Sequence, residues 1–280
     1  MSQGFSVVNN LQSAEAQRHL SRTGLDLHKS LSKLSSGFRI NKASDDPAGL
    51  AIANGLSADS MSLTQAVRNA GDAIGLVQIA DGSLSNVSVM LSRATSLATQ
   101  AASGTLGESE RQAANTEYQQ LLGEIDRVVD TTNFKGEKLF SRDSAVRKEI
   151  YVGDTRMAST IAVSVAGAQG AGTSALGLEG TSLNTAADAA AALGKMPGAI
   201  QEVSRWRGAL GAQQNRIVSS ISTIQTQNEN LVAAESTIRD ANMAEESTNL
   251  IRDKILMQSG MASLAQANIS STMVLALLKG

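Results

Sequence analysis

The residues of this chain that could do chemistry are few, and their spacing does not suit catalysis. There is no cysteine, and the two histidines, His19 and His28, lack a cysteine or paired carboxylate at ligand spacing. Glu245 and Glu246 are adjacent, so on a helix they point in different directions and form no acid–base pair. Leu193-Gly194-Lys195 is not preceded by the glycine of a phosphate loop. The sequence therefore predicts no enzyme, no cofactor and no metal site.

The composition excludes further classes of function. A net charge of -2 and 2% aromatic residues argue against a nucleic-acid surface, which needs clustered cations and stacking rings. No window of about 18 residues is continuously apolar, so we expect no membrane span. The first residues lack a basic region followed by an apolar one, which predicts no cleaved secretory signal and, taken alone, a cytoplasmic protein.

Two distant segments carry the same seven-residue apolar repeat, which is typical of long helices packed in coiled-coil style. Neither helix can bury its stripe alone, so we expect them to pack together as one helix-bundle seam. The seam residues are Leu63, Val77, Leu84 and Leu91 in the N-terminal half, with Val203, Leu210, Ile217, Ile224, Leu231 and Ile238 in the C-terminal half.

The ends of the chain form two amphipathic arms. Gly37 can end a first helix, and Asp46 before Pro47 predicts the start of a second. The last arm carries two apolar stripes, one with Ile251, Ile255, Ala262, Ile269 and Met273, the other with Leu250, Met257, Met261 and Leu264. A monomer would leave one stripe exposed, which usually marks an interaction surface.

The middle of the chain predicts a mixture of helix, hairpin and loop. Helices are expected to about residue 102 and over about 108–130, the latter with Ala114, Tyr118, Leu121, Ile125 and Val128 on one face. A turn at 134–140 precedes a β-hairpin of 149–152 with 160–165. Residues 167–198, rich in glycine, serine and alanine, predict a small exposed, mobile excursion. The fold class is mainly α: a long antiparallel helical bundle with coiled-coil terminal arms and a small β-hairpin region.

Blocks near both ends carry a family resemblance. They run from Leu34 to Ile52, over Asn133-Phe134-Lys135-Gly136 with Leu139, from Ala241 to Glu246, and from Ile255 to Asn268. In this order and at these distances from the ends, they resemble the bacterial flagellins, over roughly residues 1–140 and 200–280. The resemblance implies a subunit that self-assembles into the extracellular flagellar filament for motility.

The resemblance also implies a division into layers. Residues 1–44 with 241–280 correspond to the coiled coil of the inner filament core, and 45–240 to a helical bundle, with no sizeable outer domains. The residues expected to drive polymerisation are Leu27, Leu31, Leu34, Phe38, Ile251, Ile255, Ala262, Leu264 and Ile269.

Export and partners follow from the same resemblance. The chain is expected to leave through the flagellar type III secretion channel without a cleaved signal, and to meet a secretion chaperone, the filament cap and hook-filament junction proteins. A patch with Arg93, Leu97 and Glu117 corresponds to one that an innate immune receptor recognises in flagellins. Composition alone suggests glycosylation at Thr173, Ser174, Thr181 and Ser182.

Two other functions compete with the filament subunit. A hook-filament junction protein shares the design of the arms but is usually longer. A cytoplasmic coiled-coil adaptor would explain the repeats and the missing signal, but not the matching blocks at both ends.

Overall fold

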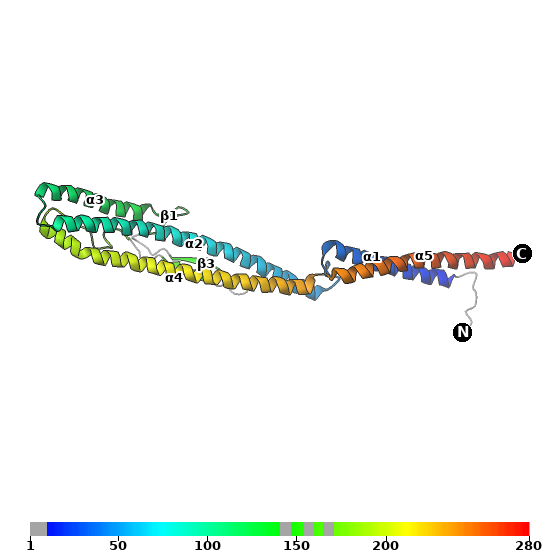
Figure 1. The fold of residues 1–280 in the computed structure, drawn as a ribbon. Helices are drawn as coiled ribbons and strands as arrows, with labels where there is room; N and C mark the ends of the chain where they lie inside the picture. The colour runs from blue at the N-terminus through cyan, green and yellow to red at the C-terminus, as the bar shows by residue number, and fades with distance from the viewer. Residues whose placement is uncertain (1–9, 141–146, 154–159, 165–170, 280) are drawn as a thin grey trace. The chain divides into compact units, whose positions relative to one another are not determined.

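The structure is a computed structural model that describes residues 10–140, 147–153, 160–164 and 171–279. Its elements, in chain order, are α1 (Leu11–Ser36), α2 (Pro47–Ala102), α3 (Glu108–Thr131), β1 (Asn133–Phe134), β2 (Glu137–Lys138), β3 (Arg147–Tyr151), β4 (Thr160–Ser164), α4 (Ala186–Arg239) and α5 (Met243–Lys279) (Figure 1). The mainly α fold with a small β-hairpin region, as predicted from the sequence, is confirmed. The structure adds a second antiparallel strand pair, β1 with β2, at the place where the sequence predicted only a turn.

The chain divides into two compact units. Unit 1 combines Met1–Ser57 with Leu231–Gly280, and unit 2 is the continuous segment Ala58–Asn230. Unit 1 therefore takes in the first turns of α2 and the last turns of α4, in addition to the two terminal arms predicted from the sequence.

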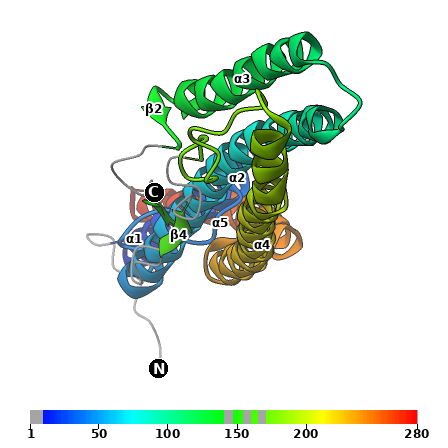
Figure 2. The same cartoon turned by 90° about the vertical axis from the view of Figure 1, so that its left-hand side faces the viewer.

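Unit 2 is built on α2, α3 and α4, and both α3 and α4 run antiparallel to α2 (Figures 1 and 2). Its core is aliphatic, with Tyr118 of α3 as a fully buried aromatic residue. On the flank, Arg207 of α4 donates from Nε to Asp81 of α2 at 2.8 Å, and this bond raises the pKa of Arg207. Eight of the predicted seam residues lie in this core: Leu63, Val77, Leu84, Leu91, Val203, Leu210, Ile217 and Ile224.

The length and apolar composition of α2 follow from its place in this core. An 18-residue window of the helix has a mean hydropathy of 1.3, enough by length and composition alone to cross a membrane. Core helices of bundles have the same property, and a third of this window is buried within the protein.

The rotation of α3 differs slightly from the prediction. The buried residues are Ala114, Tyr118, Leu122, Ile125 and Val129. Leu121 and Val128, which the sequence analysis placed on this face, are half-buried neighbours. Apolar residues at consecutive positions allow two rotations about 100° apart, and packing on the rest of unit 2 selects one of them.

The prediction of an exposed excursion over 167–198 is wrong for the residues that the structure describes. Helix α4 already begins at Ala186, and Ala189, Ala192 and Met196 on its first turns are buried despite Pro197 within the helix. The loop before it is held on α3, where Asn115 accepts the Leu183 N–H at 2.8 Å. Small side chains suit a close contact between elements as well as a loop, and here their burial outweighs the cost of proline. Residues 167–170 lie outside the described residues.

Two hairpins lie on the helices of unit 2. Lys135 and Gly136 connect β1 to β2 with φ of 50° and 87°, the left-handed pair that a two-residue type I′ turn requires. Strands β3 and β4 pair in antiparallel register, with Ile150 opposite Ile161, which confirms the predicted hairpin. The amide of Gln213 on α4 exchanges two hydrogen bonds with the backbone of Ser164, so the hairpin is held by the helix beneath it.

In unit 1 the joint between α1 and α2 follows local rules. Gly37 adopts φ of 77°, a left-handed conformation that ends α1 and that glycine adopts without strain. The Asp46 carboxylate accepts the Gly49 N–H at 2.9 Å, so it caps α2 ahead of Pro47 as predicted. Asn242 caps the start of α5 in the same manner, because its side-chain oxygen accepts the Ala244 N–H at 3.2 Å.

Candidate assembly surface

Helices α1 and α5 pack side by side and antiparallel in unit 1 (Figure 1). The contact residues of α1 recur every seven residues at Leu20, Leu27 and Leu34, and those of α5 at Leu250, Met257 and Leu264. All six are half-buried. A single pair of helices thus shields the contact stripe of each helix only in part.

The centre of this contact depends on small residues. Leu20 lies so near Gly260 that a methyl group there would meet its Cγ at 3.3 Å, and the Met257 methyl carbon lies 3.8 Å from the same position on Gly24. The two glycines therefore let the helices approach closely where large side chains oppose them.

Polar contacts fix the register at both ends of the pair. Asn10 caps α1 and donates to the Ala267 carbonyl at 3.2 Å, while Lys33 pairs with the buried Glu246 at 2.7 Å. These partners lie more than two hundred residues apart in the chain, and as the residue number rises on α1 it falls on α5. The arms therefore have one defined alignment.

A backbone clip joins the two connections of unit 1. Phe38 pairs with Asp240 as an isolated antiparallel bridge, and the Arg39 N–H donates to the Arg239 carbonyl at 2.6 Å. The Arg239 guanidinium lies 4.3 Å from the centre of the Phe38 ring. Phe38, which was predicted to belong to the polymerising arm, thus packs within its own chain.

The face of α5 opposite α1 carries an apolar stripe that no other described residue covers. Ile251, Ile255 and Ile269 are 59%, 59% and 47% exposed, and Ala262 between them is also exposed. At 100° per residue these four positions fall within about 40° of one another, so they form a single line along the helix. We call them the outer stripe. The side chain of Met273, which would extend it, lies outside the described residues.

The exposed face of α1 is mixed apolar and basic. Leu11 and Leu25 are exposed on the side away from α5, with Arg18 between them at seven-residue steps. Leu31 lies on the side of Leu27 and Leu34, yet is still 43% exposed. The sequence analysis missed Leu25, as well as Leu256 of α5, which is half exposed. The signal for Leu25 was present in the sequence, because Leu25 follows Leu11 by two seven-residue steps.

The predicted immune-receptor patch lies in unit 2 across α2 and α3. Arg93 and Glu117 form an ion pair at 2.6 Å between the two helices, and both side chains are about half exposed. Leu97 is only 3% exposed and belongs to the core. Of the three residues, only the two of the ion pair are therefore accessible at the surface.

The predicted glycosylation residues differ in accessibility. Thr173 is buried, and both its N–H and its hydroxyl donate to the Asp126 carboxylate at 2.8 Å. The Thr181 hydroxyl lies 2.7 Å from the Tyr118 hydroxyl, whose pKa is raised by burial. Ser182 is half-buried, and Ser174 is exposed.

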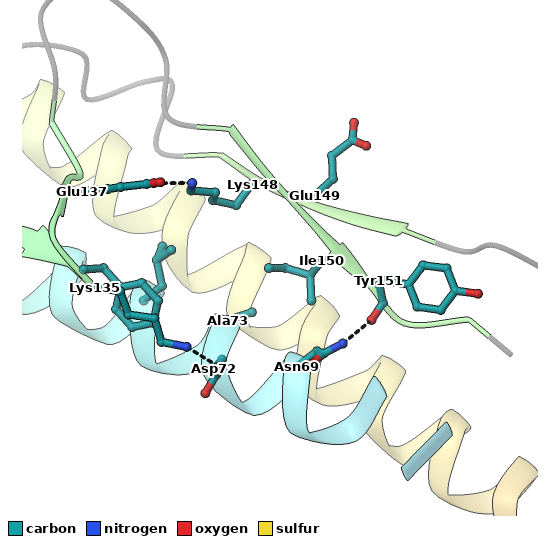
Figure 3. Close-up of a pocket in the computed structure, with 11 residues that line it drawn as sticks. Asn69, Asp72, Ala73, Lys135, Glu137, Lys148, Glu149, Ile150 and Tyr151 are labelled. Atoms are coloured by element: carbon teal, nitrogen blue, oxygen red, sulfur yellow. Dashed lines mark hydrogen bonds and ion pairs between the residues drawn. The ribbon is translucent and has the colours of Figure 1, made fainter. Parts of the chain in front are cut away.

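A pocket of about 420 Å³ lies between α2 and the two hairpins (Figure 3). Leu76, Phe134 and Ile150 contribute apolar side chains to it. Two of the three carboxylates that line it are paired with lysines, Asp72 with Lys135 at 2.7 Å and Glu137 with Lys148. Carboxylates held by lysines at the surface are not arranged as a nucleophile with its base, so the lining residues indicate a structural junction and not a catalytic site.

Comparison with known proteins identifies relatives of the whole chain. Residues 7–145 match the model of the bacterial flagellin N-terminal helical region, and residues 193–278 that of the C-terminal helical region. Flagellin of Halalkalibacterium halodurans is 39% identical over 277 residues, covering 98% of this chain and 99% of that protein. Flagellin FlaB1 of Treponema pallidum is 33% identical over 287 residues, with coverage of 98% and 99%. The crystal structure of Bacillus cereus flagellin aligns with a TM-score of 0.50 and 31% identity, covering 60% of this chain and 94% of that one.

Proposed function

This chain belongs to the bacterial flagellin family and is a structural subunit of the flagellar filament rather than an enzyme, and from that premise we propose that its outer stripe joins neighbouring copies in the filament. The observation that carries the proposal is the exposed row of Ile251, Ile255, Ala262 and Ile269 opposite α1. An exposed apolar line of this length is costly in water unless another surface covers it.

The energetics favour coupled ordering of the arms and assembly. Burying one isoleucine fully contributes about 1.5 to 3 kcal/mol. Ordering the backbone costs about 1 to 2 kcal/mol for each residue. Since α1 and α5 bury each other only in part, the arms gain most of their order when many stripe contacts form at once between copies.

The test compares two charge substitutions on α5 in filament growth from short seeds, observed by electron microscopy. Ile255→Asp places a carboxylate on the outer stripe, and we expect seeds not to grow. Ser263→Asp adds the same charge at an exposed position off both the stripe and the α1 contact, and growth should persist. Normal growth of the Ile255→Asp chain would contradict the proposal.

The same experiment extends to α1. Leu31→Asp alters a partly exposed residue of the first arm, and we expect it to stop growth while unit 2 stays folded. Trp206, the one tryptophan of the chain, is buried in unit 2 and reports on that unit alone by its fluorescence. Unchanged fluorescence together with lost growth shows that the loss of growth does not come from unfolding of unit 2.

We propose further that the chain is exported unfolded through the flagellar secretion channel without removal of a leader. Membership of the flagellin family supports this proposal, because the relatives are subunits of an extracellular filament. The secretion chaperone, the filament cap and the junction proteins are the partners expected along this route. Intact-mass measurement of sheared filaments tests whether an N-terminal segment is removed during export. A mass lower than that of the full chain by such a segment would overturn this part of the proposal.

For the immune receptor, we propose that the Arg93–Glu117 pair is the recognised surface. Its half-exposed side chains, which bridge two helices, support this proposal. Arg93→Ala should lower receptor signalling by the monomer, and Arg68→Ala, an exposed change elsewhere on α2, is the control. Equal signalling by both variants would contradict the assignment of the ion pair.

For glycosylation, Ser174 is the most accessible of the four candidates. Peptide mass spectrometry of filaments from wild-type and Ser174→Ala cells tests whether Ser174 carries a glycan.

A further inference from the structure

The chain contains a single Asn-Gly pair, Asn54 followed by Gly55, near the start of α2 in unit 1. The Asn54 side chain is exposed. Among peptide sequences, Asn-Gly is the most prone to self-deamidation, because glycine has no side chain to hinder attack by its own backbone nitrogen. We propose that Asn54 is a self-modification site whose reaction is prevented by the folding of α2.

The reaction requires no enzyme and no oxidant. The backbone nitrogen of Gly55 loses its proton and attacks Cγ of Asn54, forming a five-membered succinimide as the side-chain nitrogen leaves as ammonia. Water then adds to one of the two succinimide carbonyls and opens the ring. The product is aspartate or isoaspartate, and the net change replaces an amide nitrogen by a carboxylate oxygen.

The α-helix obstructs this reaction in two ways. A helical residue donates its N–H to the carbonyl four residues back, which for Gly55 is that of Ala51, so the attacking nitrogen is engaged. Ring closure also requires the ψ of Asn54 to leave its helical value of about −42°. Reaction therefore needs local opening of α2, and its rate in the folded chain falls with the free energy of that opening.

The product matters because of where Asn54 lies. Ala53 beside it is fully buried, and α2 continues through this point as an unbroken helix. Isoaspartate adds a methylene group to the backbone, which shifts the i to i−4 hydrogen-bond ladder on either side. A chain that reacts while unfolded is thus expected to form the first turns of α2 poorly, and to enter filaments less readily than an unmodified chain.

Peptide mass spectrometry of the full chain, incubated at mildly alkaline pH with and without urea, tests the protection by folding. Asn86 is the internal reference, because it is also exposed on α2 but precedes valine, whose branched side chain hinders attack. In urea we expect Asn54 to deamidate at least about tenfold faster than Asn86. Without urea its rate should fall at least about tenfold, equivalent to about 1.4 kcal/mol of local opening.

Two variants and one further measurement complete the test. Gly55→Ala should slow the reaction of Asn54 in urea, where packing has no role, and Asn54→Gln should abolish the signal at this site. After ageing in urea, refolding and seeded growth, isoaspartate at position 54 should be depleted in filaments relative to the supernatant. Equal rates in the two solvents would overturn the protection by folding, and equal isoaspartate content would overturn the effect on assembly. Neither measurement depends on the route of export.

Discussion

The two units bury their helices to very different degrees. In unit 2, three helices surround a core in which Leu84, Leu91 and Ile125 are completely buried. In unit 1, the only buried residue of α1 is Ser30, and Glu246 and Asp253 of α5 are buried beside a half-covered apolar contact. Three helices can enclose a dry core, whereas two helices leave each other half exposed. The comparison teaches that unit 2 contains most of the monomer's buried apolar core, and the half-exposed arms of unit 1 fit the proposal that other copies complete it.

The largest expected effect contrasts leucine in one unit with isoleucine in the other. Leu84→Ala leaves a cavity in the core of unit 2 and should lower the free energy of unfolding by about 2 to 5 kcal/mol. Ile255→Ala removes an exposed side chain and should change it by less than about 0.5 kcal/mol. Urea unfolding followed by Trp206 fluorescence measures the effect of Leu84→Ala on unit 2, and hydrogen exchange of α5 amides measures the effect of Ile255→Ala on unit 1. A large loss for Ile255→Ala would mean that the outer stripe is already buried in the monomer.

The second prediction concerns one ion pair in each unit. Lys33→Ala leaves the buried Glu246 without its partner and should weaken the α1–α5 pair by about 1 to 3 kcal/mol. Arg93→Ala breaks the exposed pair with Glu117 and should cost less than about 1 kcal/mol. Hydrogen exchange of α1 amides measures the local stability of unit 1, and exchange of α3 amides measures that of unit 2. If Lys33→Ala leaves α1 exchange unchanged, the pairing contributes nothing to unit 1.

The third prediction uses glycines that differ in their surroundings. A methyl group at Gly71 of α2 meets no atom within 4 Å, so Gly71→Ala should stabilise unit 2 by about 0.5 to 1 kcal/mol. A methyl group at Gly260 of α5 would approach Leu20 closely, so Gly260→Ala should give no such gain. Thermal unfolding monitored by circular dichroism distinguishes the two. An equal gain at both positions would show that α1 and α5 are loosely associated in the monomer.

The smallest expected effect is a loss of local stability at low pH at the α1–α2 connection of unit 1. The Lys42 N–H donates to the Asp45 carboxylate at 3.0 Å, and this bond lowers the pKa of Asp45. A lowered pKa means that the stabilisation is present above the ordinary aspartate pKa of about 3.9 and is lost as the pH falls through the folded value. Asp45→Asn should remove this acid sensitivity from amide exchange around the α1–α2 connection, while exchange in α3 keeps the wild-type profile. An unchanged acid profile at the connection would contradict the assignment.

Local rules made the joint between α1 and α2 predictable from sequence. Gly37 and Asp46-Pro47 carry their conformations in their own chemistry, and the structure shows both as expected. The start of α4 was missed because the residues around Pro197 read locally as a loop, while burial of Ala189 and Met196 makes them helical. Tertiary packing decides such segments, and a single sequence does not display it.

The candidate surface was partly predictable for a related reason. Two stripes on α5 follow from the seven-residue period, but which one faces α1 depends on a partner more than two hundred residues away. The structure places Leu250, Met257 and Leu264 toward α1 and leaves the stripe of Ile251 and Ile255 exposed. Met261, grouped with the first set by spacing, is half exposed because it lies at the edge between the two faces.

The order of segments along the chain has a consequence for synthesis. Unit 2 is one uninterrupted stretch of the chain, whereas unit 1 is formed by two segments that precede and follow unit 2 in the sequence. As translation proceeds, α1 emerges first and has no partner until α5 has been made, so pairing of such high contact order comes last. A premature stop codon anywhere before α5 therefore removes the partner of the first helix together with the last. Only a product translated through α5 can pair both arms, and a filament built through those arms excludes truncated chains.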